Sequence, residues 1–86
     1  MKSPFIDTNI FLRFLIKDPI NPHLNEQAKK VILEIERGDL FAQTHLLIIA
    51  ELIYVLESYY EKSHQEIIEL VEPLIILDGI FFPDGQ

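Results

Sequence analysis

The chain has 86 residues, of which 49% are hydrophobic, and its seven basic and 14 acidic side chains give a net charge of −7. This apolar content excludes a disordered chain, and the length allows a single domain spanning 1–86. The absence of cysteine excludes disulfides and cysteine-based zinc sites. Non-specific nucleic-acid binders are usually basic, so this chain can approach a phosphate backbone only where a basic partner or bound cations change the local field.

The apolar residues occur in short runs of at most five, whereas a membrane-spanning helix needs about 20. Asp7 and Arg13 interrupt the apolar N-terminal stretch, which therefore does not resemble a signal peptide. We expect a cytoplasmic protein that makes no use of a membrane. So much aliphatic surface on a short chain also predicts either a partner or a missing piece of the domain.

Hydrophobic periodicity and punctuating residues divide the chain into short elements. They predict a strand at 2–6, a helix at 10–16, a helix from 22 to about 37, a strand at 40–42, a helix from about 45 to 60, a helix from 64 to about 78 and a strand at 80–82. Strands that alternate with helices predict an α/β fold with a parallel sheet and helical crossovers.

Several residues predict where these helices begin and end. Asp7, Thr8 and Asn9 can each cap the first helix, and Asn21 precedes Pro22 at the start of the second. The second helix should end at Gly38, and Thr44 is the expected cap of the third. Ser63 and Glu66 form a capping-box pattern for the fourth, in which Pro73 should cause a bend or mark an error in the assignment.

Asp7 is the first candidate site residue. It directly follows the first predicted strand, and ligands of open α/β sheets bind beyond the carboxyl ends of the strands. The alternative is a purely structural helix cap, and both roles can hold together.

Glu51 is the second candidate. It is the only charged residue between Thr44 and Leu56. Its helical neighbours are apolar, so an ionised carboxylate there should need a partner or a metal ion. The alternative is an internal ion pair with Arg13 or Lys17.

Two carboxylates that converge at a strand end suit a hard divalent cation such as Mg²⁺ or Mn²⁺. Thr8 and Asn9 offer further oxygen atoms beside Asp7, although capping and turn roles are the alternative for both. Asp18 precedes a proline, which favours an Asx turn over a site role.

The remaining polar and aromatic candidates have weaker patterns. His23, His45 and His64 share no spacing and are expected at the surface. Tyr54, Tyr59 and Tyr60, with Phe11 and Phe14, are expected in the core or an interface. A base-stacking platform formed by these aromatic residues is the alternative, and no basic surround supports it.

Two segments resemble a known family. Phe5-Ile6-Asp7-Thr8-Asn9-Ile10-Phe11-Leu12 resembles the opening of PIN-domain nucleases, especially VapC-type toxins of toxin–antitoxin pairs. Ile49-Ala50-Glu51-Leu52-Ile53-Tyr54-Val55-Leu56 resembles their second motif, and the resemblance extends over nearly the whole chain.

The resemblance implies a PIN-like three-layer α/β/α fold and an endoribonuclease that cleaves RNA with metal-activated water. Asp7 matches the first acid of the family pattern and Glu51 the second, and both would hold Mg²⁺ or Mn²⁺. Asn9 matches a position that supports the first acid, and Thr44 matches the small hydroxyl residue before the third helix. The implied partners are an RNA substrate, a cognate antitoxin and a second copy of the chain in a dimer.

The chain departs from the family pattern in its length. Family members carry further acids, strands and helices after the point where this sequence stops, and neither Asp78 nor Asp84 matches those acids. The family strand order 3-2-1-4-5 would leave the first strand as an open edge. We therefore expect a partial domain with half an active site. The alternative is an inactive remnant that dimerises or binds an antitoxin.

Overall fold

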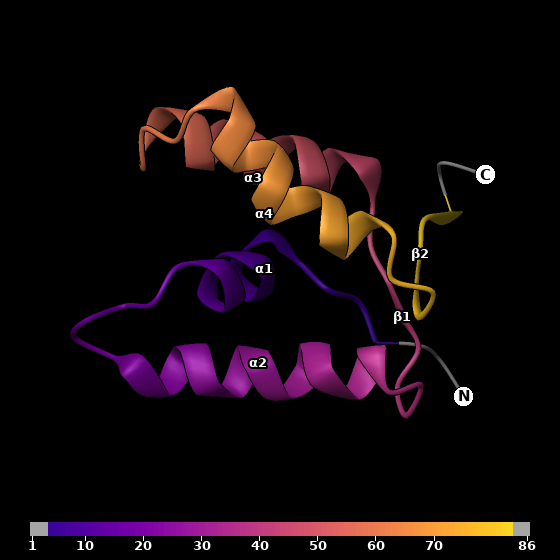
Figure 1. Ribbon diagram of the computed structural model, residues 1–86. Coiled ribbons are helices and arrows are strands. Elements are labelled where there is room, and N and C mark those ends of the chain that lie inside the picture. The colour runs from indigo at the N-terminus through magenta and orange to yellow at the C-terminus, as the bar shows by residue number, and fades with distance from the viewer. Residues whose placement is uncertain (1–3, 84–86) are drawn as a thin grey trace.

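The computed structural model describes residues 4–83, which form four helices and a two-stranded parallel sheet. In chain order the elements are α1 (Thr8–Leu15), α2 (Pro22–Glu36), β1 (Ala42–Gln43), α3 (Leu46–Ser58), α4 (His64–Ile75) and β2 (Ile80–Phe81) (Figure 1). The protein is therefore a small mixed α/β domain, which agrees with the predicted class.

β1 is the middle segment of the sheet. It pairs in parallel with β2 on one side, and on the other side Phe5 forms a parallel bridge to Gln43. The Ile6 N–H donates to the Gln43 carbonyl, and the Gln43 N–H donates to the Pro4 carbonyl, both at 2.9 Å. The predicted strand at 2–6 lies partly outside the described residues, and its described part is this bridge.

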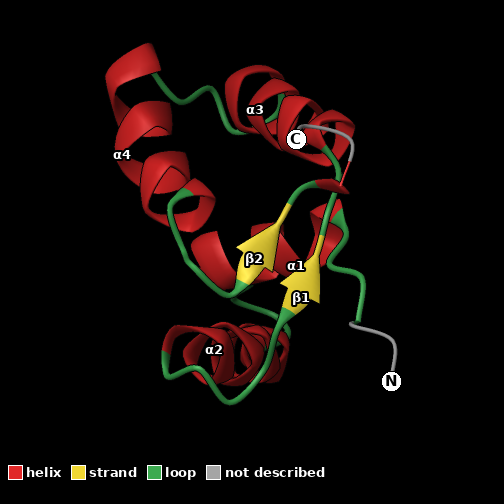
Figure 2. Ribbon diagram, turned by 90° about the vertical axis from the view of Figure 1, so that its right-hand side faces the viewer, coloured by secondary structure: helices red, strands yellow, loops and turns green. Residues whose placement is uncertain are grey.

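Helices lie on both sides of the strands. α2 lies on one side of β1 and β2, and α3 and α4 lie on the other (Figure 2). α1 packs against both α2 and α3. The core between these elements is almost entirely apolar, and its buried members are Ile6, Phe11, Ile32, Ile35, Ala42, Ile49, Leu52, Leu56, Ile67, Val71, Leu74 and Ile80.

Local sequence signals account for most helix ends. The Asp7 side chain caps α1, and Ser63 and Glu66 form the complete capping box predicted for α4. Gly38 follows α2 with a φ of +83°, a conformation that residues with a Cβ rarely adopt. Asn21 precedes α2 but makes no side-chain capping bond.

The prediction that Thr44 caps the third helix is wrong. His45 occupies the cap position of α3, and its side chain makes no capping bond. The Thr44 side chain is fully buried, and its hydroxyl donates instead to the Ile6 carbonyl at 2.8 Å. The hydroxyl therefore joins two parallel segments of the sheet, which a local capping pattern does not reveal.

Pro73 does not end α4, which continues to Ile75. A proline removes the hydrogen bond to the carbonyl four residues earlier, and in the last turn this affects a single intrahelical bond. α3 ends at Ser58, slightly earlier than predicted. Of the helices described here, none has both the length and the apolar character needed to cross a bilayer.

Candidate functional site

Asp7 lies where the chain leaves the sheet and enters α1. The preceding residue, Ile6, is bound to β1, and the Asp7 backbone is extended, with φ −100° and ψ 178°. Asp7 Oδ1 accepts a long hydrogen bond of 3.3 Å from the Ile10 N–H. The carboxylate is exposed, so Asp7 both caps the helix and presents charge to solvent at the strand end.

Glu51 lies in the middle of α3 and is exposed, contrary to the expectation of an apolar environment. Its neighbours Leu47 and Tyr54 are each 67% exposed, so their apolar character does not bury it. Glu51 forms no ion pair with Arg13 or Lys17 among residues 4–83, which removes the predicted alternative. Burial therefore gives no energetic reason for Glu51 to need a metal ion.

The two acids nevertheless line one hollow. Asp7 and Glu51 enclose it with Thr8, Asn9 and Leu12, and Ile48 and Val55 of α3 complete a space of about 380 Å³. The Thr8 hydroxyl donates to Glu51 Oε2 at 3.4 Å, so the first turn of α1 lies directly against the middle of α3. Residues 43 positions apart in the sequence thus meet near the end of the first strand.

The donor set of this hollow is rich in oxygen and contains two carboxylates. Asp7 Oδ1 and Glu51 Oε2 accept the hydrogen bonds already described, and the second oxygen of each carboxylate accepts none within residues 4–83. This chemistry fits Mg²⁺ or Mn²⁺ in kind. The number of ligand side chains is small, because residues 4–83 contain no group of three or more acidic or histidine side chains that could hold a metal ion.

The late aspartates do not add to the site. Asp78 lines a different hollow, beside Gly38 and Gly79 at the end of α2. Asp84 lies outside the described residues.

The supporting residues have distinct positions. Asn9 is exposed and lines the acidic hollow, but no hydrogen bond joins it to Asp7 in the described part of the chain. Thr44 supports the site indirectly, since it binds the carbonyl of Ile6, the residue before Asp7.

Other polar predictions are confirmed. Asp18 Oδ1 accepts hydrogen bonds from the N–H groups of Ile20, at 2.8 Å, and Asn21, at 3.2 Å, as expected for an Asx turn. All three histidines are exposed. The His45 ring packs near Phe5 with centroids 5.1 Å apart, and His64 Nε2 lies 3.5 Å from Glu57.

The aromatic residues divide into two groups. Phe11 is fully buried and Phe14 partly buried, whereas Tyr54, Tyr59 and Tyr60 are 67%, 77% and 37% exposed. The sequence indicated no basic surround for the tyrosines, but the fold brings Arg13 and Lys17 to the hollow that Tyr59 and Tyr60 line. Distant segments form this hollow, so no local pattern could have predicted it.

Comparison with known proteins identifies no relative: no family model matches the chain, and no curated protein and no solved structure matches it significantly.

Proposed function

We propose that this chain is a PIN-type module for metal-dependent cleavage of RNA in the cytoplasm. One observation carries the proposal: the acids of the two motifs, Asp7 and Glu51, line the same hollow at the end of the first strand. The order of the sheet, with β1 between β2 and the Phe5 segment, also agrees with the 3-2-1 arrangement of that family.

In this proposal the residues of the hollow bind and orient the reacting groups. Asp7 is held at the start of α1 by its capping bond, and Glu51 is positioned by the Thr8 hydroxyl. When bound, Mg²⁺ or Mn²⁺ supplies a Lewis acid that activates water and offsets the charge of a phosphodiester. Asp7 and Glu51 are the groups of this chain that would hold the ion, with Asn9 at the rim to contact substrate.

Two carboxylates leave most coordination positions to water, and Mg²⁺ releases its waters reluctantly. We therefore propose that the chain by itself binds the ion weakly and cleaves RNA slowly. The second candidate function is a binding module for an antitoxin or for another copy of the chain. It is favoured by the apolar groove between α3 and α4, where Ile53, Ile68 and Ile75 are partly exposed.

Calorimetric titration with Mn²⁺ tests the proposed site. We expect weak binding, on the order of 1 mM, because ligand charge and number set the affinity of such sites. Asp7→Asn and Glu51→Gln should each abolish it. Glu57→Gln, an exposed change on the same helix that does not line the hollow, should leave it intact. Tight binding that survives both site variants would contradict the assignment.

Cleavage of a single-stranded RNA with Mg²⁺ or Mn²⁺ tests the reaction. Any activity of the chain should disappear in Glu51→Gln and remain in Glu57→Gln. Activity that survives Glu51→Gln would rule out the proposed mechanism. A chain that folds but neither binds Mn²⁺ nor cleaves RNA would contradict the nuclease proposal.

A further inference from the structure

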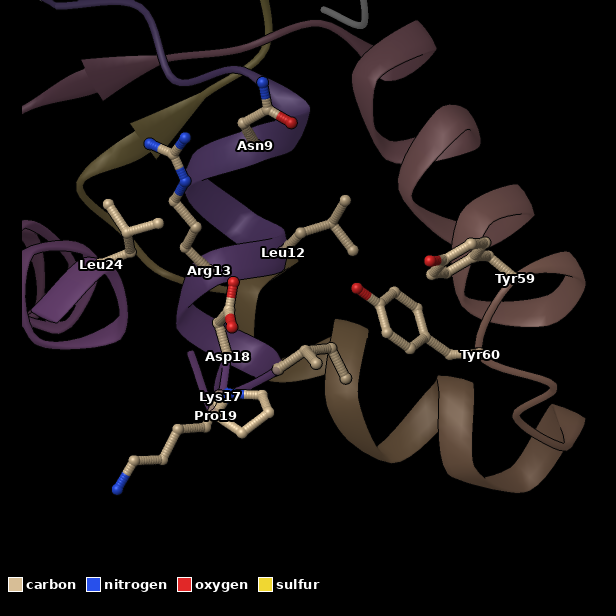
Figure 3. A pocket seen from close by; sticks show the side chains of 10 residues that line it. Asn9, Leu12, Arg13, Lys17, Asp18, Pro19, Leu24, Tyr59 and Tyr60 are labelled. Carbon is tan, nitrogen blue, oxygen red and sulfur yellow. The ribbon is translucent and has the colours of Figure 1, made fainter. Parts of the chain in front are cut away.

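A second hollow lies beside the acidic one, farther along α1, with a volume of about 430 Å³. It is bounded by α1, by the loop between α1 and α2, and by the segment that follows α3 (Figure 3). Its chemistry differs from that of the acidic hollow, because aromatic and basic side chains line it together.

Tyr59 and Tyr60 form one wall of this hollow. Their rings lie 4.9 Å apart at an interplanar angle of 81°, so the pair is edge to face and its outer ring faces are not stacked on each other. Both side chains extend from the end of α3 toward α1, where Leu12 lies opposite (Figure 3). Tyr59 is 77% exposed, which leaves a planar aromatic surface open to a flat ligand.

Arg13, on α1, and Lys17, in the segment that follows α1, also line this hollow. They are two of only seven basic residues in the chain, and neither forms an ion pair within residues 4–83. The Arg13 guanidinium extends along α1 toward Asn9, and the Lys17 side chain points away from the tyrosine rings (Figure 3). The hollow thus provides a local positive group on a protein whose net charge is negative.

Asp18 is the acidic residue that lines this hollow. Its Oδ1 already accepts two backbone hydrogen bonds in the Asx turn, which fixes the carboxylate in the loop. Arg13 and Lys17 outnumber it, so the lining carries a net positive charge.

The two hollows are adjacent. Asn9 and Leu12 line both of them, so the surface of α1 is continuous from Asp7 and Glu51 to the tyrosines. A flexible chain molecule that crosses α1 at Asn9 would reach both the acidic residues and the aromatic wall.

We propose that the Tyr59–Tyr60 hollow binds one nucleotide of a single-stranded RNA, with its base against the tyrosine rings and its phosphate beside Arg13. This proposal rests on the ribonuclease function proposed above. Base–aromatic stacking tolerates any base, and a basic side chain beside the rings is the usual means of holding the backbone. The hollow would place a nucleotide next to the one at the acidic site.

The test measures binding of a fluorescent oligouridine by anisotropy in EDTA, so that neither metal nor cleavage contributes. A matched oligonucleotide with abasic positions keeps the phosphates and removes the rings. Wild-type protein should prefer the base-containing strand roughly fivefold or more, the range expected for stacking of one base. Tyr59→Leu/Tyr60→Leu should remove this preference, whereas Tyr54→Leu, an exposed change of the same kind elsewhere on α3, should keep it.

Salt dependence tests the phosphate contact. Arg13→Gln should weaken binding of both strands and reduce the slope of log affinity against log salt by about 0.7, the value for one phosphate of a single strand. Arg37→Gln removes the same charge from the far end of α2, which does not line this hollow, and should leave the slope unchanged. Circular dichroism should show that all variants are folded.

The two proposals fail in different ways. The nucleotide site is overturned if the wild type does not bind the oligonucleotide, or if the hollow variants and their controls change binding equally. Either result would hold whatever the cleavage assay shows. Selective loss of binding in the hollow variants supports the site even when the chain cleaves no RNA, in which case only the catalytic proposal fails.

Discussion

Two buried polar side chains hold the N-terminal segment in place. Thr44 donates to the Ile6 carbonyl at 2.8 Å. Asn25, on α2, donates through Nδ2 to the carbonyls of Arg13, at 2.7 Å, and Phe14, at 3.2 Å. These carbonyls lie in the last turn of α1, where no intrahelical donor remains for them. Side chains from later elements therefore fix both ends of the segment that carries Asp7.

Thr44→Val tests the first of these bonds. Valine has nearly the same shape, so the change removes the hydrogen bond and leaves the Ile6 carbonyl without this partner. We expect the free energy of unfolding to fall by about 1–3 kcal/mol in urea denaturation. Thr8→Val removes a longer bond in an accessible position and should cost less than half as much. Equal losses would show that burial does not decide the value of these bonds.

Asp7 and Glu51 show how far residue patterns can predict a site. The position of Asp7 followed from the order of strand and helix, because both are local features. The exposure of Glu51 did not follow from its apolar neighbours, since Leu47 and Tyr54 are themselves on the surface. The bonding of Asn25 was also missed, because its partners belong to another helix.

Capping chemistry correctly predicts the start of α1 and of α4, and the capping box of α4 is the clearest example. The Ser63 N–H donates to Glu66 Oε1 at 2.9 Å, and the Ser63 hydroxyl accepts from the Glu66 N–H at 3.2 Å. The bond from the Ser63 backbone is the main cause that lowers the pKa of Glu66 below its ordinary value. The ionised carboxylate is therefore favoured in the folded state.

This lowered pKa predicts a pH-dependent contribution to stability. The contribution should be present above the ordinary glutamate pKa, about 4.3, and disappear as the pH falls through the lower pKa of the folded state. Urea midpoints of the wild type and Glu66→Gln should differ at neutral pH and converge in acid. Glu72→Gln, which lies outside the capping box, should show no such convergence. A difference that grows on acidification would contradict this sign.

Gly79, the residue before β2, is packed closely against the end of α2 and the segment that follows it. A Cβ atom at this position would lie 2.7 Å from Ile35 Cγ2, 3.0 Å from the Ile35 carbonyl oxygen and 3.2 Å from the Leu40 carbonyl oxygen. Gly79→Ala should therefore force a shift between β2 and the end of α2.

We expect Gly79→Ala to lower the free energy of unfolding by about 1–3 kcal/mol, the usual range for overpacking. Gly38→Ala has open space around it and should cost about 1 kcal/mol through its positive φ alone. Thermal and urea denaturation would measure both. A neutral Gly79→Ala would show that α2 and β2 adjust freely to each other.

At the scale of the whole molecule, the most evident feature is exposed apolar surface. Large hydrophobic side chains of α3 and α4 contribute much of it, including Leu46, Leu47, Ile53, Ile68 and Ile75, which are 37–67% exposed. The high aliphatic content of the sequence predicted such an excess, because a short chain cannot bury it all. The sequence could not show which faces would be left exposed.

We expect the chain to dimerise through this surface, with about 800 Å² buried per partner in an interface of standard size. Light scattering coupled to size exclusion should give the dimer mass at micromolar concentration. Ile68→Lys should shift the mass toward the monomer, whereas Ile20→Lys, in the loop before α2, should not. A wild-type monomer at these concentrations would contradict the prediction.

The position of β1 in the middle of the sheet has a consequence for folding kinetics. The Thr44–Ile6 bond joins residues 38 positions apart, and β2 reaches β1 only after the whole of α3 and α4. A helical turn closes a short loop of the chain. Pairing of β1 with the Phe5 segment, or with β2, closes a long loop and therefore costs more chain entropy before any contact forms. We therefore expect the helices to form first and the sheet to limit the refolding rate, although few residues belong to it.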